Sequence, residues 1–301
     1  MRPRVFPFLV LLAFGMFGAL LAPFASADTL NTADNFAVLA GSTITNAGAG
    51  VLGATVITGE MGVSPGTACT GFSACPVTGP GTSGTVHLAD GVSLQAQKDL
   101  TTAFTTEGAL GAAGTLVPGG VLHGTYGPGA YNVPAASLTG TIFLNDGGVA
   151  GSVFIFFTSS SLTTAPNSSI NVSGLKPSDS VFWVVDSTAT LGNNTAFYGN
   201  ILALTDIIFD PGATDLCGRA LARNGEVTFA GQDPTSLIEN QISTTCSGNL
   251  ATSNGLGGGT TTSGGGGGGN SVPEPGTLLL LASGLVGLLG MARMRERESS
   301  K

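Results

Sequence analysis

Residues 163–170 read Thr-Thr-Ala-Pro-Asn-Ser-Ser-Ile, residues 190–197 read Thr-Leu-Gly-Asn-Asn-Thr-Ala-Phe, and residues 208–215 read Ile-Phe-Asp-Pro-Gly-Ala-Thr-Asp. When the three stretches are aligned, their turn-forming pairs Pro-Asn, Asn-Asn and Pro-Gly fall at the same place. Apolar runs precede them: residues 153–156 align with residues 181–184 and, more loosely, with residues 201–204. Each copy is therefore predicted to carry a buried strand, a turn and a hydroxyl-rich strand.

The spacing of these copies favours a β-solenoid. The offsets between them are 27 residues (190 minus 163) and 18 residues (208 minus 190). Such irregular offsets are expected when stacked coils carry loops of different length, because each coil buries its inner face only against its neighbours. A β-sandwich is the alternative architecture, since it uses the same alternation of apolar and polar residues, but it does not require turns to align copy after copy.

One segment departs from this pattern of short strands. From Asp90 to about Glu107 the apolar residues recur at helical spacing, and Gly108 follows. The residues that share this helical face are Val92, Ala96, Leu100, Ala103 and Phe104. The chain is therefore predicted to be all-β with one amphipathic helix packed alongside.

Both ends of the chain look like targeting segments. A basic start, an apolar run and Ala25-Ser26-Ala27 predict a secretory signal peptide over residues 1–27. Residues 249–271 consist almost entirely of Gly, Thr and Ser, a composition typical of a flexible tether. One folded domain is thus predicted over residues 28–248, with a separate terminal segment over residues 272–301.

The terminal segment combines a short motif, an apolar stretch and a basic end. Pro273, Glu274 and Pro275 precede the apolar residues 277–292, which are followed by three arginines at positions 293, 295 and 297. The apolar stretch is short for a stable transmembrane helix, which needs about 20 residues. This ending resembles the PEP-CTERM sorting signal of Gram-negative bacteria. The resemblance implies transient anchoring in the inner membrane, processing by an exosortase and a final location at the cell surface or outside the cell.

Composition narrows the classes of partner. Only 9% of the residues are charged, against about 25% in an average globular protein, and the net charge of -8 argues against nucleic acid as a partner. In an exported chain, four cysteines predict up to two disulfides. A local bridge between Cys69 and Cys75 would leave Cys217 and Cys246 as the second pair, although the sequence does not fix this connectivity.

Several stretches carry a resemblance to one family. Residues 30–46 (LNTADNFAVLAGSTITN) and 56–66 (VITGEMGVSPG) resemble the opening of the DUF3494 ice-binding proteins. Further matching segments follow in the same order, at residues 129–131, 140–142, 153–156, 181–183, 189–192 and 218–222. The resemblance implies a right-handed, discontinuous β-helix of triangular section with one long helix alongside. It also implies an extracellular protein that adsorbs to ice and has antifreeze activity, with no cofactor, no metal and no catalysis.

A flat face of such a solenoid offers a physical route to ice binding. Strands stack about 4.7 to 4.9 Å apart and alternate residues lie about 6.6 to 7 Å apart, so outward hydroxyls form a two-dimensional grid. The segment Thr164-Ala165-Pro166-Asn167 resembles an element of some family members, but a regular Thr-x-Thr ladder is missing. Threonine is also a common strand residue and serine a common turn residue, so a single such residue is no evidence for ice binding. Only a row of them aligned on successive strands would indicate an ice-binding face. The candidate ice-binding residues are Thr163, Ser168, Ser169, Thr188, Thr190, Thr195 and Thr214.

Two other functions are compatible with the sequence. An exported solenoid on a tether could be a cell-surface adhesin or a component of an exopolysaccharide matrix without ice affinity. A polysaccharide-active enzyme would need paired carboxylates. The available charged side chains are Asp206, Asp210, Asp215, Arg219 and Arg223. The two histidines, His87 and His123, lie far apart without metal-ligand spacing, so a metal site or a nucleophilic triad is not predicted.

Overall fold

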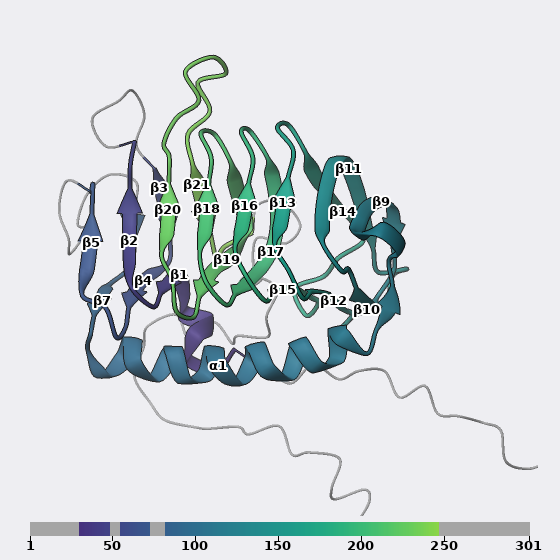
Figure 1. Ribbon diagram of the computed structural model, residues 1–301, viewed down its shortest axis with the longest axis horizontal. Coiled ribbons are helices and arrows are strands. Elements are labelled where there is room, and N and C mark those ends of the chain that lie inside the picture. The colour runs from purple at the N-terminus through teal and green to yellow at the C-terminus, as the bar shows by residue number, and fades with distance from the viewer. Residues whose placement is uncertain (1–29, 49–54, 73–81, 247–301) are drawn as a thin grey trace, which may run out of the picture. The chain divides into compact units, whose positions relative to one another are not determined.

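The computed structural model describes residues 30–48, 55–72 and 82–246, and these form a parallel β-helix (Figure 1). The predicted signal peptide, the tether and the terminal sorting segment lie outside the described residues. Among the residues that are described, no helix combines the length and the apolar character that crossing a membrane requires. Each coil of the solenoid passes through three parallel sheets, which we call faces A, B and C.

The three faces are defined by strand pairing. Face A consists, in spatial order, of β8 (Thr115–Leu116), β10 (Gly129–Asn132), β12 (Val153–Thr158), β15 (Ser180–Val185), the second half of β17 (Ala196–Ala203), the second half of β19 (Thr214–Ala222), β1 (Phe36–Ala40), β4 (Glu60–Val63) and β7 (Val86–Leu88). Face B consists of the first part of β9 (Val121–Tyr126), the first part of β11 (Ala136–Asn145), β13 (Leu162–Thr164), β16 (Ala189–Leu191), β18 (Ile207–Phe209), β20 (Val227–Phe229), β2 (Thr43–Asn46) and β5 (Ala68–Thr70). Face C consists of the second parts of β9 and β11, β14 (Ser169–Ser173), the first parts of β17 and β19, β21 (Gln241–Ser243), β3 (Val56–Thr58) and β6 (Thr82–Ser83).

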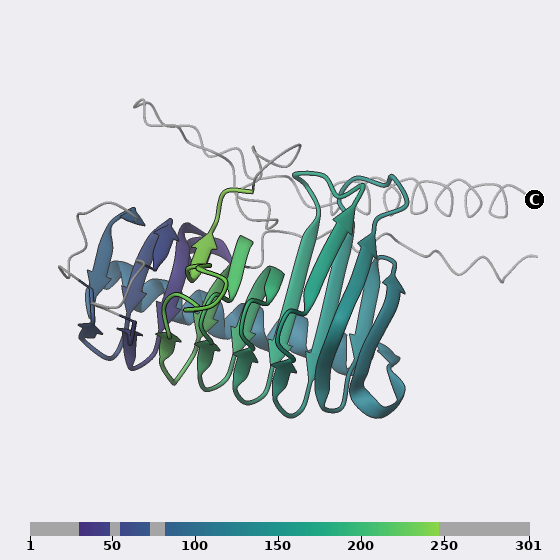
Figure 2. The same ribbon diagram turned by 90° about the horizontal axis from the view of Figure 1, so that it is seen from above.

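The order of coils in space differs from their order in the chain. β1 lies between β19 and β4, so the first coil stacks on the last one. The chain then moves away from this junction through β4 and β7 and crosses to the far end of the solenoid, where β8 begins (Figure 1). From there the coils wind back in a right-handed sense until they meet β1, as parallel crossovers do in nearly all proteins (Figure 2). The predicted discontinuous, right-handed β-helix is confirmed.

The crossing to the far end is made by α1 (Gly91–Ala112), which lies along face A (Figure 1). Its 22 residues span about 33 Å at 1.5 Å per residue, most of the roughly 38 Å covered by nine strands at their usual spacing. The helix is longer than the sequence indicated, because Gly108 and Gly111 do not end it. A Cβ on Gly111 would come within 2.4 Å of Phe157, so glycine here permits close packing on the sheet.

Asp90 caps the first turn of α1. Its carboxylate accepts hydrogen bonds from the backbone N–H groups of Val92 and Ser93, at 3.0 and 2.9 Å, and contacts His87 Nδ1 at 2.6 Å. These contacts, led by the Ser93 N–H, lower the pKa of Asp90 to about 2. Ala96, Leu100, Ala103 and Phe104 are buried against face A as predicted, whereas Val92 is exposed. The helix therefore covers the sheet with one apolar stripe.

Face A is buried on both sides, and this affects how its strands can be aligned. The sequence pairs Val153 with Val181, but the structure pairs Val153 with Ser180 and Phe154 with Val181. The predicted alignment of Val181 with Ile201 is wrong by two residues, since Ile201 pairs with Trp183 in the structure. Strands covered on both faces read as continuous apolar runs, and these contain no alternation from which a register can be inferred.

A buried ion pair joins the first coil to the last. The guanidinium of Arg219 lies 2.6 Å from a carboxylate oxygen of Asp34, donates to the backbone carbonyl of Asp34 at 2.8 Å, and donates to Asn200 Oδ1 at 2.9 Å. The Arg219 side chain is completely buried. Because 185 residues separate the two partners, the contact exists only when the discontinuous junction is closed.

One of the two predicted disulfides is described. Cys217 and Cys246, 29 positions apart in the sequence, are bonded and close a covalent loop that includes β20 and β21. Cys75 lies outside the described residues, so the local bridge to Cys69 stays a prediction.

Candidate functional site

Face B carries one unbroken register row of outward side chains. The pairings align Thr163 of β13 with Thr190 of β16, and the same row extends across every strand of the face. Its members, in spatial order, are Val121, Ser137, Thr163, Thr190, Ile208, Thr228, Thr45 and Thr70. We call this set the central row. Each of its members is partly or fully exposed, and none carries a charge. Neighbours stand one strand spacing apart, about 4.8 Å.

The central row is chemically simple. Five of its eight members are threonines, and each offers a methyl group and a hydroxyl group at the same position. Thr70 donates to the hydroxyl of Thr45 at 3.3 Å, which links two members across strands β5 and β2. The hydroxyl oxygen of Thr228 is buried without a hydrogen-bond partner among the described residues, so this threonine presents mainly its methyl group. The face can therefore hold water through spaced hydroxyls while its methyl groups keep the surface apolar.

A second row lies two residues upstream of five members of the central row. It contains Ser161, Thr188, Asp206, Glu226 and Thr43, all half-buried. The Thr188 hydroxyl is 2.9 Å from that of Thr205, and Thr43 donates to the Ala68 carbonyl at 3.0 Å. Asp206 accepts the Glu226 backbone N–H at 3.0 Å, so one carboxylate is partly held by the backbone. The second row thus places two acidic side chains beside an uncharged central row.

The structure places the seven candidate residues in three environments: face B, face C and the interior. Thr163 and Thr190 belong to the central row, and Thr188 to the second row. Ser169 and Thr214 lie on face C, where Ser169 and Thr141 are hydrogen-bonded at 2.8 Å. Ser168 and Thr195 are buried. The expectation that all seven share one face is therefore wrong.

Ser168 and Thr195 point inward because of the turns that precede them. Asn167 and Asn194 have φ of 60° and 55°, a left-handed conformation that changes which side of the chain the next residue faces. Ser168 donates to the Leu138 carbonyl at 3.1 Å, and the Thr195 hydroxyl is 2.7 Å from that of Thr164. Both hydroxyls therefore stabilise the corner between faces B and C. Thr164, Leu191 and Phe209 point inward.

Sequence reasoning missed most of the central row. The members that it did not select are Val121, Ser137, Ile208, Thr228, Thr45 and Thr70. Val227-Thr228-Phe229 repeats the pattern of Ile207-Ile208-Phe209 and could have been aligned as a further copy. Thr45 and Thr70 could not, because their coils precede the repeat in the chain and join it only where β1, β2 and β3 pair with β19, β20 and β21.

The charged residues considered for an enzyme do not form one site. Asp215 is fully buried, and burial raises its pKa well above the usual range. Arg219 is buried in the ion pair with Asp34. Arg223 lies over the Phe104 ring, 4.9 Å from its centroid, and so holds α1 to the solenoid. These positions serve the interior and the helix.

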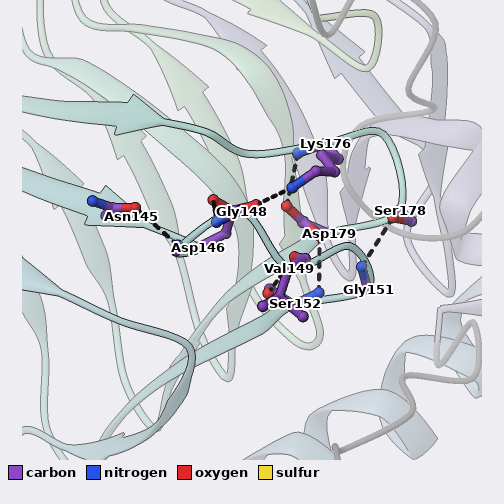
Figure 3. Close-up of polar contacts among 10 residues, drawn as sticks. Asn145, Asp146, Gly148, Val149, Gly151, Ser152, Lys176, Ser178 and Asp179 are labelled. Carbon is purple, nitrogen blue, oxygen red and sulfur yellow. Dashed lines mark hydrogen bonds and ion pairs between the residues drawn. The ribbon is translucent and has the colours of Figure 1, made fainter.

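A further polar cluster lies where face C turns into face A (Figure 3). Asp146 is buried and its carboxylate accepts from Lys176 Nζ at 2.7 Å and from the Gly148 N–H at 2.8 Å. Burial raises the pKa of Asp146, but these contacts outweigh it, and the net shift is downward. Asp179 accepts the backbone N–H groups of Ser152 and Lys176. Both carboxylates are engaged in holding two loops together.

Comparison with known proteins agrees with this architecture. The family model described as ice-binding-like matches residues 38–234, and that of the PEP-CTERM protein-sorting motif matches residues 271–295. An ice-binding protein of Nostoc sp. (strain HG1) is 38% identical over 283 residues, which cover 91% of this chain and 90% of the relative. Ice-binding protein K3-B1 of Typhula ishikariensis is 30% identical over 200 residues, covering 60% and 79% of the two chains.

Solved structures show the same fold. A crystal structure of an ice-binding protein from an Antarctic biological consortium is 36% identical, with a TM-score of 0.58, and covers 71% of this chain and 89% of that one. The ice-binding protein of the Antarctic ascomycete Antarctomyces psychrotrophicus is 33% identical, with a TM-score of 0.60, and the match covers 71% of this chain and 96% of the fungal one. With the family model matching well over half of its length, the chain belongs to the ice-binding-like protein family.

Proposed function

We propose that this protein adsorbs to ice through face B and thereby limits the growth and recrystallisation of ice outside the cell. The observation that carries the proposal is the central row, a continuous, uncharged row of partly or fully exposed side chains, five of them threonines, held at strand spacing. Strongly hydrated ions would bind water in other geometries, whereas hydroxyl and methyl groups on a rigid sheet can hold it in a lattice-like order. The backbone pairing fixes these positions before any water binds, so little ordering entropy is lost on adsorption.

The proposal also covers the cellular location of the protein. The match to the PEP-CTERM motif supports export, handling by an exosortase and a final location at the cell surface or in the surrounding matrix. The proposed organisation is a signal peptide (residues 1–27), the ice-binding domain (28–248), a Gly/Thr/Ser-rich tether (249–271) and the sorting segment (272–301). We assign no catalytic role to Asp206 and Glu226 of the second row, and we propose that the protein is not an enzyme.

The direct test measures ice activity of residues 28–248. We expect thermal hysteresis and inhibition of ice recrystallisation, and we expect growing ice to incorporate the protein. If concentrated protein leaves ice growth unchanged and is excluded from the crystals, the alternative of a matrix protein or adhesin with the same fold is favoured. Release of reducing or unsaturated sugars from a panel of polysaccharides would instead favour an enzyme.

Glu226 gives a test in the opposite direction, because its removal is expected to increase activity. Replacing Glu226 by Thr removes a charge from the second row and continues the hydroxyl pattern toward Thr43, its neighbour on β2. The hydrogen bond from residue 226 to Asp206 uses the backbone N–H and is retained. The concentration needed to inhibit recrystallisation should fall by several-fold.

The matched control for this variant is Glu239→Thr. Glu239 lies in the segment between β20 and β21, outside both rows, so the same change in charge should leave ice activity as it was. Equal gains in the two variants would mean that net charge, and not the surface of face B, controls adsorption.

A further inference from the structure

The described chain ends at the edge of the solenoid that is opposite face B. β21 belongs to face C, and Cys246 follows it at the corner with face A. Its disulfide partner Cys217 lies between the face C residue Asp215 and the face A residue Gly218 of β19. In a triangular section, the edge between faces A and C is the one farthest from face B, and the last strand leads to that side (Figure 2).

The strand next to this exit is weak on its own. β21 has three residues, two of which pair with β19 and three with β3. Beyond it, Thr244 bonds to the Thr58 carbonyl through its backbone at 3.0 Å and its hydroxyl at 3.3 Å. Pulling on the chain beyond Cys246 would load these few hydrogen bonds one after another and peel β21 from the sheet.

β19 is held much more firmly. It has nine residues, pairs with β17 at seven positions, and also pairs with β1 through Ala220 and Leu221. Gly218 to Ala222 are buried, and Arg219 adds its ion pair to Asp34. A force applied to β19 is therefore shared at once among many bonds in the middle of the stack.

We propose that the Cys217–Cys246 disulfide is a mechanical clamp that passes tension from the C-terminal tether directly into β19. The inference rests on the proposed location at the cell surface or in the matrix, and it adds that the protein is held there through its C-terminal segment. A protein attached through its C-terminus and adsorbed to ice through face B carries load between these two places. The clamp takes β21 out of that load path, and Cys246 lies at the A–C edge, away from face B.

Single-molecule force spectroscopy between position 163 and position 271 tests the clamp. A click-reactive amino acid at position 163 accepts one handle, which imitates a hold on face B and leaves all four cysteines unchanged. The oxidised protein should show no early event at low force. Cys217→Ser with Cys246→Ser should add one, in which residues 230–246 are pulled out, lengthening the chain by about 6 nm at roughly 3.5 Å per residue.

The control is Ile242→Ala, which weakens β21 but keeps the disulfide. Ile242 is buried in the interior, so this variant should lower the melting temperature without creating the low-force event. The clamp is refuted if Ile242→Ala peels at low force with its disulfide intact, or if the variant without the disulfide shows no early event. Because the measurement needs no ice, it gives the same answer whether or not the protein binds ice.

Discussion

Thr163→Tyr combined with Thr190→Tyr is expected to abolish most of the ice activity while leaving the melting curve unchanged. The two positions are register partners in the middle of the central row, and both side chains point outward. Two rings raised above the face would keep the neighbouring threonines from reaching the same ice plane. If this removes about 1.4 kcal/mol or more of adsorption free energy, activity falls by roughly tenfold or more. Ice-recrystallisation inhibition and thermal hysteresis measure the loss, and calorimetry measures stability.

The matched control places the same two rings on face C. Ser169 and Ala196 are register partners on adjacent strands there, and both are at least partly exposed. Ser169→Tyr with Ala196→Tyr should leave ice activity close to that of the unmodified protein. If this pair loses activity and the face B pair does not, face C is the ice-binding surface, and Ser169 and Thr214 regain their candidacy.

Arg219→Met is expected to have the largest effect on stability. The substitution removes the ion pair with the Asp34 carboxylate, which lies inside the protein. Removing one member of a buried ion pair costs about 3 to 5 kcal/mol. Denaturant titration should show a correspondingly lower free energy of unfolding, and proteolysis should begin in the first coil, where Asp34 lies.

The double variant Arg219→Met with Asp34→Asn separates the charge from the packing. Because the double variant removes both charges of the buried ion pair, it should be more stable than Arg219→Met alone. A double variant as unstable as the single one would show that the hydrogen bonds of Arg219 to the Asp34 carbonyl and to Asn200 matter more than the ion pair.

The sequence by itself determined the local features of this fold. Aligned turns around Pro166, Asn193 and Pro211 identified stacked coils, and their register on face B agrees with the structure at Thr163, Thr190 and Ile208. This was possible because strands with one exposed side alternate between apolar and polar residues. The helix was likewise visible from its apolar spacing, and the pairing of Cys217 with Cys246, which the sequence left open, is present.

Only the tertiary structure decided which side chains share a surface. The left-handed backbone conformation of Asn167 and Asn194 turns the side chain of the next residue toward the interior, so Ser168 and Thr195 are buried. Thr45 and Thr70 joined the central row because β1 inserts between β19 and β4, a contact between segments about 180 residues apart in the chain. A pattern of apolar and polar residues records which side of a strand is buried, but it does not record which distant strand lies beside it. That choice depends on contacts such as Arg219 with Asp34, which form only when the whole solenoid has closed.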